Sequence, residues 1–247
     1  MVSPVNAYIL CSTPRTGSTL LCSLLQATGV AGYPESYFRS QDIAARAKAW
    51  GICRQDGSFT FEDYLNCVLE RGRSTNDVFS TRVMWGTMAE LTSNLRLIGT
   101  AGDDLEVLSQ AFGTTKFVYL ERIDRVAQAI SRLRAEQTHV WHVTDSADHA
   151  NPKREAFYNE AAIQHYIDES EAHDRAWNKW FHQNNILPLR LNYEDLDAAA
   201  IPVVHQVLDF IGVDHPKIPI TASNVRMADD MSAEWAQRFR SNTGYSD

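Results

Sequence analysis

A glycine, an arginine and several hydroxyl residues interrupt an otherwise apolar stretch near the start of the chain. Residues 10–20 read LCSTPRTGSTL, with apolar residues before this segment and helically spaced leucines after it. We therefore expect a loop between a strand and a helix. The first amides of a helix have no partner within it, and the helix dipole adds positive charge there. Such a loop is suited to a phosphate or sulfate, and its candidate ligands are Arg15, Thr16, Gly17, Ser18 and Thr19.

The same loop has a simpler interpretation, in which its hydroxyls only cap the helix and Arg15 is solvated. The placement of Arg15 and Gly17 directly after an apolar strand favours anion binding over this alternative. The loop lacks the lysine of the GxxxxGK[ST] pattern, which binds nucleotide phosphates together with magnesium. ATP or GTP hydrolysis is therefore disfavoured, and an anion site that works without a metal is expected.

The bulk composition is typical of a soluble globular protein. The 247 residues are 44% hydrophobic and 22% charged, and the formal net charge is −8. This acidic balance argues against broad binding to nucleic acid or to an anionic membrane surface. The apolar stretch at Tyr8–Cys11 is too short for a signal peptide or a membrane span, and the four cysteines form no CxxC pair. We expect one domain over residues 1–247, reduced thiols and a cytoplasmic location.

Short runs rich in β-forming residues alternate with helical patterns along the chain. The sequence predicts strands at Ala7–Ser12, Val78–Met84, Lys116–Leu120 and Leu187–Asn192. It predicts helices at Gly17–Thr28, Gly86–Leu97, Leu105–Phe112, Asp124–Gln137 and Glu155–Asn184. This alternation is typical of an α/β protein with a parallel sheet covered by helices on both faces. Residues 33–73 form a helical and loop insertion, expected over the carboxyl ends of the strands, where open α/β sheets bind ligands.

Six segments together are more specific than the loop alone. They are PRTGSTLL at 14–21, ATGVAGYPESYF at 27–38, VMW at 83–85, VAQAIS at 126–131, RAEQTHVW at 134–141 and the terminal EWAQRFR. The loop resembles the 5′-phosphosulfate loop of sulfotransferases, and the set resembles the bacterial trehalose 2-sulfotransferase family. The resemblance implies a P-loop-NTPase-like fold and 3′-phosphoadenosine 5′-phosphosulfate (PAPS) as the donor, with PAP as its product. It also implies a carbohydrate or glycolipid acceptor and a homodimer, and it implies no metal.

The resemblance assigns donor-binding roles along the chain. Arg15 and its loop would bind the phosphosulfate, while Arg122 and Ser131 would bind the 3′-phosphate. Arg226 resembles a family arginine that would close over the nucleotide. Without the resemblance, a surface ion pair of Arg122 with Glu121 or Asp124 would be favoured. In that reading Ser131 would bond its own helix backbone, and Arg226 would be a solvated loop charge.

The residue that would take the proton from the acceptor hydroxyl is out of register with the family. The family's pattern after the first helix is a glycine, a variable residue, proline, another variable residue and a catalytic Glu, whereas residues 32–36 read GYPES. Glu35 thus comes one position early, and Ser36 occupies the expected place. Either Glu35 reaches the acceptor from a shifted turn, or the base lies elsewhere and Glu35 caps the next helix. We favour Glu35 as the general base, because the segment has no histidine and the base must reach the hydroxyl.

The acceptor side is expected to combine a positive charge with aromatic side chains. Arg82 resembles a basic family position near the donor sulfate, and a strand-end charge facing water is the alternative. An aromatic wall for a sugar is predicted from Tyr33, Tyr37, Phe38 and Trp50. Ordinary core packing is the alternative, above all for Phe38 and Trp50. The predicted substrate-binding residues are Pro14, Tyr33, Glu35, Ser36, Tyr37 and Arg82.

Two further features are assigned structural roles. His139 and His142 have no HxxxH or HExxH spacing, so we do not expect them to bind a metal. The spacing of Trp177, Trp180 and Phe181 predicts one buried helix face.

The sequence thus predicts a PAPS-dependent sulfotransferase, and two other functions stay open. A nucleotide or sugar kinase that uses the loop for ATP would need a lysine and a carboxylate metal ligand. A nucleotide-binding protein without catalysis would fit the loss of the family's base at Ser36. The expected partner is a small carbohydrate or glycolipid acceptor, with neither nucleic acid nor a membrane span.

Overall fold

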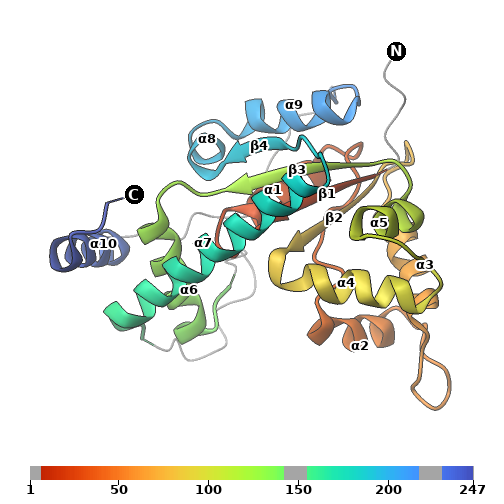
Figure 1. Ribbon diagram of the computed structural model, residues 1–247, viewed down its shortest axis with the longest axis horizontal. Helices are drawn as coiled ribbons and strands as arrows, with labels where there is room; N and C mark the ends of the chain where they lie inside the picture. Colours follow the sequence, from red (N-terminus) through yellow and green to blue (C-terminus); the bar gives the residue numbers. More distant parts are fainter. Residues whose placement is uncertain (1–6, 142–154, 217–229, 247) are drawn as a thin grey trace.

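A four-stranded parallel sheet lies at the centre of the protein in the computed structural model, which describes residues 7–141, 155–216 and 230–246 (Figure 1). The strands follow the order β2-β1-β3-β4 across the sheet. Their bounds are Ala7–Ser12 for β1, Phe79–Met84 for β2, Thr115–Glu121 for β3 and Leu189–Asn192 for β4. The predicted α/β class is confirmed, and each predicted strand is found close to its predicted bounds.

Helices connect and flank the strands. In chain order they are α1 Ser18–Ala27, α2 Ser40–Ala49, α3 Phe61–Arg71, α4 Trp85–Leu97, α5 Asp104–Phe112, α6 Arg125–Thr138, α7 Glu160–Gln183, α8 Tyr193–Ala198, α9 Ala200–Ile211 and α10 Asp230–Thr243. Each predicted helix is present, and α7 begins at Glu160 instead of Glu155. Helices α8 and α9 lie outside the predicted set, although the apolar spacing from Val203 to Ile211 is helical.

The strands end together at one edge of the sheet. Ser12 at the end of β1 pairs with Met84 of β2 and with Leu120 of β3. Glu121 of β3 pairs in turn with Asn192 of β4. Because all four strands run in the same direction, the segments that follow them gather at this carboxyl edge. Those segments begin at Thr13, Trp85, Arg122 and Tyr193.

Helices cover both faces of the sheet, which is why every residue of β1 is buried (Figure 1). Helices α1 and α9 pack with Tyr8 and Leu10 on one face. Helices α4, α5 and α7 pack with Ile9 and Cys11 on the other. Alternate residues of β1 thus point into the two layers, as the pleat of a strand requires.

A further apolar cluster lies between α6, α7 and α10. Ile130 of α6, Ile167 of α7 and Phe239 of α10 are buried together there. The predicted buried face of α7, formed by residues 177, 180 and 181, packs instead with the sheet. The first half of α7 therefore supports α6, and its second half holds both against the strands.

The insertion at 33–73 supplies α2 and α3 and shares a core with the sheet. Phe38 packs against Phe61 and Phe112, with ring centroids 6.4 and 5.8 Å away. Tyr64 is fully buried, and its hydroxyl donates to the backbone carbonyl of Tyr37. Phe38 is therefore a core residue and not part of an acceptor wall.

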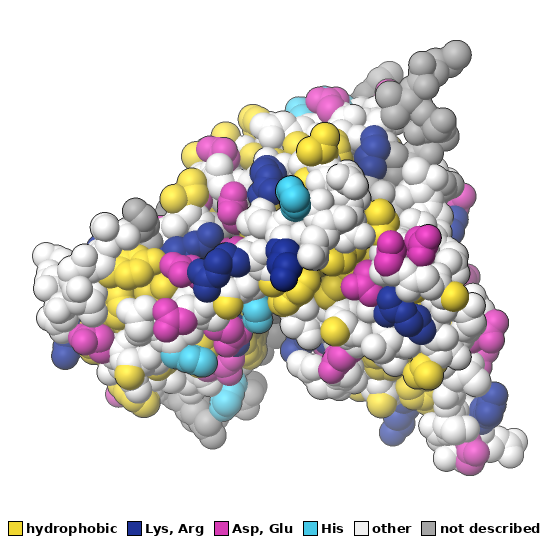
Figure 2. Space-filling model, in the orientation of Figure 1, with side chains coloured by type: hydrophobic (Ala, Val, Ile, Leu, Met, Phe, Trp, Pro, Cys, Tyr) yellow, Lys and Arg dark blue, Asp and Glu magenta, His cyan; other side chains and the backbone are white. Residues whose placement is uncertain are grey.

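The surface carries charges of both signs. On the face that Figure 2 shows, acidic and basic side chains are interspersed, and the surface is notched between the part with α6, α7 and α10 and the part with α2 and α4. Within the described parts of the chain, no helix is long and apolar enough to cross a membrane. Because the surface charges are mixed, any anion binding must come from local groups and not from a broad surface field.

We expect Trp177→Ala to lower the free energy of unfolding by about 3–5 kcal/mol, because it empties a fully buried site. The Trp177 indole packs edge-on against Trp85 at 5.0 Å and donates from Nε1 to the Ser12 carbonyl at 3.2 Å. Urea unfolding measures the loss. The control is Leu187→Ala, at a side chain that is 91% exposed, where about 0.5 kcal/mol or less is expected. Equal, small losses in both variants would contradict this packing.

Candidate active site

The loop between β1 and α1 has a backbone shape that requires glycine at its end. Arg15 and Gly17 both adopt left-handed backbone angles, with φ of 68° and 78°. Gly17 also lies against α8, where an added Cβ atom would stand 2.5 Å from Cδ2 of Tyr193. Gly17 begins α1 without a side-chain cap, so the first amides of the helix face the loop. This is the geometry of an anion-binding turn.

Two buried side chains from α6 and α7 hold the loop in place. Gln128 Nε2 donates to Thr13 Oγ1 at 3.0 Å and to the Pro14 carbonyl at 2.8 Å. Trp177 binds the Ser12 carbonyl just before the loop. Thr16 Oγ1 donates to the Thr13 carbonyl at 3.0 Å, which closes the turn on itself. The loop is therefore pre-formed, and Pro14 and Thr16 contribute mainly to its shape.

Arg15 connects the loop to α6. Its Nε donates to Ser131 Oγ at 2.9 Å, and its Nη1 donates to the Trp141 carbonyl at 2.6 Å. Burial lowers the pKa of Arg15, and the positive charge of Arg122 lowers it further. The residues predicted for the phosphosulfate and for the 3′-phosphate therefore lie side by side in the fold.

Arg122 is a partly buried cation, and one of its donors has no acceptor among the described residues. Its Nη1 donates to the Arg15 carbonyl at 3.3 Å, and its guanidinium lies 4.3 Å from the centroid of the Tyr193 ring. Its Nε is buried and has no hydrogen-bond partner among the described residues. Burial also lowers the pKa of Arg122. An unsatisfied buried donor of this kind costs about 1–3 kcal/mol, so an anion bound here would be stabilising.

The backbone after Arg122 is fixed by carboxylates. The two carboxylate oxygens of Glu194 accept from the amides of Ile123 and Asp124, each at 3.1 Å. Asp124 caps α6 and pairs with Arg240 of α10 at 2.8 Å. The Asp124 carboxylate thus binds the start of α6 and Arg240, and it does not form the surface ion pair considered for Arg122.

Arg82 of β2 extends the positive region toward the insertion. Its Nη1 donates to Thr19 Oγ1 at 2.8 Å and to Ser18 Oγ at 3.3 Å, both at the start of α1. Its Nε donates to Ser36 Oγ at 2.8 Å. Arg82 is therefore not a strand-end charge facing water, and it connects the donor loop to the segment that follows α1.

Glu35 and Ser36 lie on opposite sides of that segment. Ser36 is buried beside Arg82. The Glu35 carboxylate is half exposed and pairs with Nη1 of Arg46 at 3.0 Å, whereas its backbone carbonyl accepts from the Arg82 amide at 2.9 Å. Successive side chains of an extended segment point to opposite faces, which explains why one residue of shift changes the partner.

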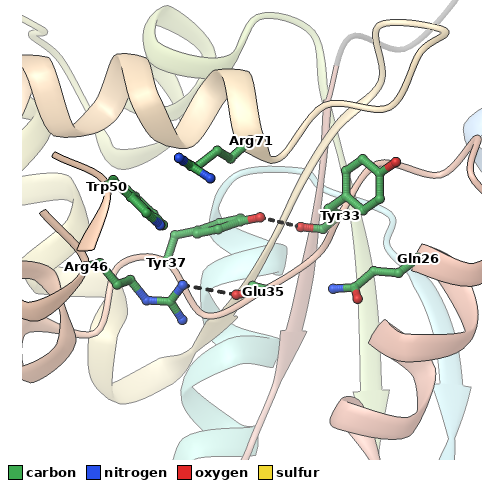
Figure 3. A pocket seen from close by; sticks show the side chains of 7 residues that line it. All are labelled: Gln26, Tyr33, Glu35, Tyr37, Arg46, Trp50 and Arg71. Atoms are coloured by element: carbon green, nitrogen blue, oxygen red, sulfur yellow. Dashed lines mark hydrogen bonds and ion pairs between the residues drawn. The ribbon is translucent and has the colours of Figure 1, made fainter. Parts of the chain in front are cut away.

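An open hollow of about 290 Å³ lies on the Glu35 side (Figure 3). The Tyr37 hydroxyl donates to the Tyr33 carbonyl at 2.8 Å across it. Trp50 forms one wall and stacks on Tyr64 behind it at 5.4 Å. The lining residues are Gln26, Tyr33, Glu35, Tyr37, Arg46, Trp50 and Arg71.

The predicted substrate-binding residues fall into two groups. Tyr33, Glu35 and Tyr37 line the hollow, together with Trp50 from the predicted aromatic wall. Pro14, Ser36 and Arg82 lie instead at the donor loop. Arg226 and His142 lie outside the described residues. Within the described residues, no group of three or more His, Cys, Asp or Glu side chains is placed to hold a metal ion.

Sequence reasoning missed Gln128, Tyr193 and Glu194. Tyr193 and Glu194 directly follow the predicted strand that ends at Asn192, so the rule that strand ends carry ligand contacts would have found them. Arg46 and Arg71 belong to the predicted insertion, but nothing in their spacing singles them out. Gln128 has no distinguishing signal, because its role depends on where α6 meets the loop.

A match to a family model shows which protein family the chain belongs to. Residues 7–242 match the model of the Stf0 sulphotransferase family. The chain belongs to this family. The matched residues include the β1–α1 loop, the insertion and the helices that support them. The chain is accordingly a sulfotransferase. The predicted family is confirmed, and the alternative that the protein is a kinase is wrong.

Two curated relatives align with this chain over nearly its whole length and theirs. The chain is 32% identical to a trehalose 2-sulfotransferase of Mycobacterium tuberculosis, over 97% of this chain and 96% of the relative. It is 30% identical to a trehalose 2-sulfotransferase of Mycolicibacterium smegmatis, over 95% and 94%. A solved sulfotransferase from Alicyclobacillus acidocaldarius aligns over 100% of this chain and 98% of its own, at 12% identity and a TM-score of 0.46.

We expect Gly17→Ala to weaken PAP binding, because the new Cβ atom would displace Tyr193 and with it the ring that supports Arg122. Gly29→Ala is a matched control. Its φ of +68° is close to the +78° of Gly17, but nothing lies within 4 Å of an added Cβ atom. Both variants lose about 1–2 kcal/mol to the left-handed backbone, and only Gly17→Ala loses PAP affinity by calorimetry. Equal PAP affinities would refute the contact.

Proposed function

We propose that the protein transfers the sulfuryl group of PAPS to a hydroxyl of a carbohydrate. The observation that carries this proposal is the pair of partly buried guanidiniums, Arg15 and Arg122, at a pre-formed strand-to-helix turn. The buried Nε of Arg122 without a partner supports an anionic ligand in this place. Family membership supports PAPS as that ligand, since the Stf0 family is a sulfotransferase family.

The donor site is proposed to have two anion subsites. Arg15, the amides of Thr16, Gly17, Ser18 and Thr19 and the hydroxyls of Ser18 and Thr19 would bind the phosphosulfate. Arg122 and Ser131 would bind the 3′-phosphate, and Ser131 would exchange its bond from Arg15 for one to the phosphate. PAPS fits the residues present, because their positive charges and unpaired donor match a ligand with two separated anionic groups. Arg226 is proposed to contact the nucleotide.

The reaction needs one bond made, one broken and one proton removed. The acceptor oxygen bonds to sulfur as the bond from sulfur to the bridging phosphate oxygen breaks, and the hydroxyl proton passes to a base. PAP leaves with the electron pair of the broken bond. Arg15 and Arg82 lie where they would stabilise the charge that develops on the leaving side and on the sulfuryl oxygens.

Glu35 is the proposed general base. It is the carboxylate that lines the hollow, while Ser36 at the family's position lacks a group that accepts a proton near neutral pH. The Glu35 carboxylate pairs with Nη1 of Arg46 at 3.0 Å, and this contact fixes its position at the hollow. The aromatic rings of the hollow would contact the faces of a sugar.

A carbohydrate acceptor is supported by the two relatives, which are both named as trehalose 2-sulfotransferases. Whether this chain uses trehalose itself is decided by the hollow, whose lining residues come from the insertion. The homodimer and the cytoplasmic location stay predictions.

The function is tested by transfer of labelled sulfate from PAPS to disaccharides, with product detected by mass spectrometry. We expect Arg15→Ala to abolish transfer and to weaken PAP binding by about tenfold or more, because it removes charge-assisted hydrogen bonds. Arg39→Ala is the control, since Arg39 pairs with Asp42 on the surface of α2. Unchanged PAP affinity in Arg15→Ala would refute its role. Tight PAP binding by the native enzyme with no sulfated product would favour a binding protein instead.

We expect Glu35→Gln to lower kcat by about 10²–10⁴-fold, as loss of a general base does. PAP affinity should stay near that of the native enzyme, because Glu35 does not contact the donor loop. Asp42→Asn is the matched control: it removes a nearby carboxylate that does not line the hollow. Full turnover in Glu35→Gln would assign proton removal to another group.

A further inference from the structure

Two guanidiniums converge on the hollow that Glu35 lines. Arg71, at the end of α3, lies 5.0 Å from the Trp50 ring centroid, and Arg46 of α2 lies 5.8 Å from it. Arg46 also lies 5.5 Å from the ring of Tyr37. Figure 3 shows Tyr37 between the two arginines, with Tyr33 and Gln26 at the far end of the hollow. Two cations beside one indole repel each other unless an anion joins them.

The charges of the lining do not cancel. Glu35 balances Arg46. Arg71 pairs with no carboxylate in the described parts of the chain; its Nε donates to Cys67 Sγ at 3.3 Å. The remaining lining residues are neutral, and burial raises the pKa of Tyr37, so its hydroxyl stays protonated. The hollow therefore has one positive charge in excess, carried on a group that binds carboxylate or phosphate with two parallel hydrogen bonds.

The hollow extends along α1 from Glu35, whose carbonyl accepts from the Arg82 amide, to Gln26. Thr19 contacts Arg82 at the start of the helix, and Gln26 lines the hollow seven residues later. At 1.5 Å per residue this is about 10 Å along the helix axis. Cys22 lies between them, and burial raises its pKa to about 11, so it adds no charge. An acceptor that reaches both places must be extended.

We propose that the acceptor is an anionic carbohydrate, with a carboxylate or phosphate group held by Arg71 and Arg46 in the hollow and its reacting hydroxyl toward Arg82. This inference rests on the proposed function and specifies its acceptor. A neutral sugar in the same place would partly desolvate Arg71 without offering it an anion, which costs binding free energy. The same feature therefore attracts acidic sugars and disfavours neutral ones.

The test compares matched disaccharides that differ in one group. Trehalose is compared with its monophosphate, and cellobiose with cellobiouronic acid, in which a carboxylate takes the place of one hydroxymethyl group. Binding to the PAP-saturated enzyme is measured by calorimetry, and transfer from labelled PAPS is measured as kcat/KM. We expect at least one acidic sugar to bind about tenfold or more tightly than its neutral partner. The phosphate and carboxylate arms identify which anion the hollow prefers.

Variants of Arg71 test whether the preference for acidic sugars arises in the hollow. Arg71→Gln should remove it, chiefly through KM, while leaving PAP affinity unchanged, and Arg71→Lys should keep part of it. Arg73→Gln is the matched control, because Arg73 follows α3, pairs with Asp77 and does not line the hollow. The preference in the native enzyme should also weaken as salt is raised.

The outcomes separate this inference from the proposed reaction. Tighter binding of an acidic sugar that Arg71→Gln abolishes supports the inference even if no sulfate is transferred, and then the proposed reaction alone fails. Equal binding and equal kcat/KM for acidic and neutral sugars overturn the inference, even if both are sulfated. Binding of neither class, or a preference that survives Arg71→Gln, also overturns it.

Discussion

The structure depends on holding two like charges together at the carboxyl edge of the sheet. Arg15 and Arg122 lie side by side and are partly buried, and this burial lowers the pKa of each. Such a pair is tolerated only where dipoles and rings compensate it. Ser131, the Arg15 carbonyl and the Tyr193 ring do so here, and the Nε of Arg122 is still left without an acceptor. Holding these two cations together lowers the stability of the fold, and a bound ligand with negative charges would restore it.

The rest of the molecule is arranged around that constraint. Helix α6 carries Gln128 and Ser131 to the loop, and α7 holds α6 against the sheet through its own aromatic face. Glu194 of α8 fixes the backbone that follows Arg122. The proposed donor side is therefore held by contacts from regular elements, whereas the proposed acceptor side is built mostly from the insertion. Arg82 connects the two sides by bonding to the start of α1 and to Ser36.

Much of the fold, and the meeting of Arg15 with Arg122, was predictable because local chemistry dominates there. The apolar runs of β1 and β3 and the loop LCSTPRTGSTL carry their signals in neighbouring residues, and the strand-end rule places Arg122 beside the loop. Gln128 and Arg71 were not predictable. A polar residue inside a helix has the same spacing whether it faces solvent or a loop, and only the packing of α6 and α3 gives these two side chains their partners.

The sequence by itself determined an α/β sulfotransferase with a strand-to-helix turn at Arg15, because strand, turn and helix signals and family motifs are local properties of the chain. Only the tertiary structure decided what lies beside that turn. It directed Ser36 to Arg82 and Glu35 to Arg46, because alternate residues of an extended segment face opposite sides. It also brought Arg71 and Arg46, which are far apart in sequence, to one indole and so created the charge of the hollow. Long-range packing, which no local pattern encodes, sets the chemistry of the hollow.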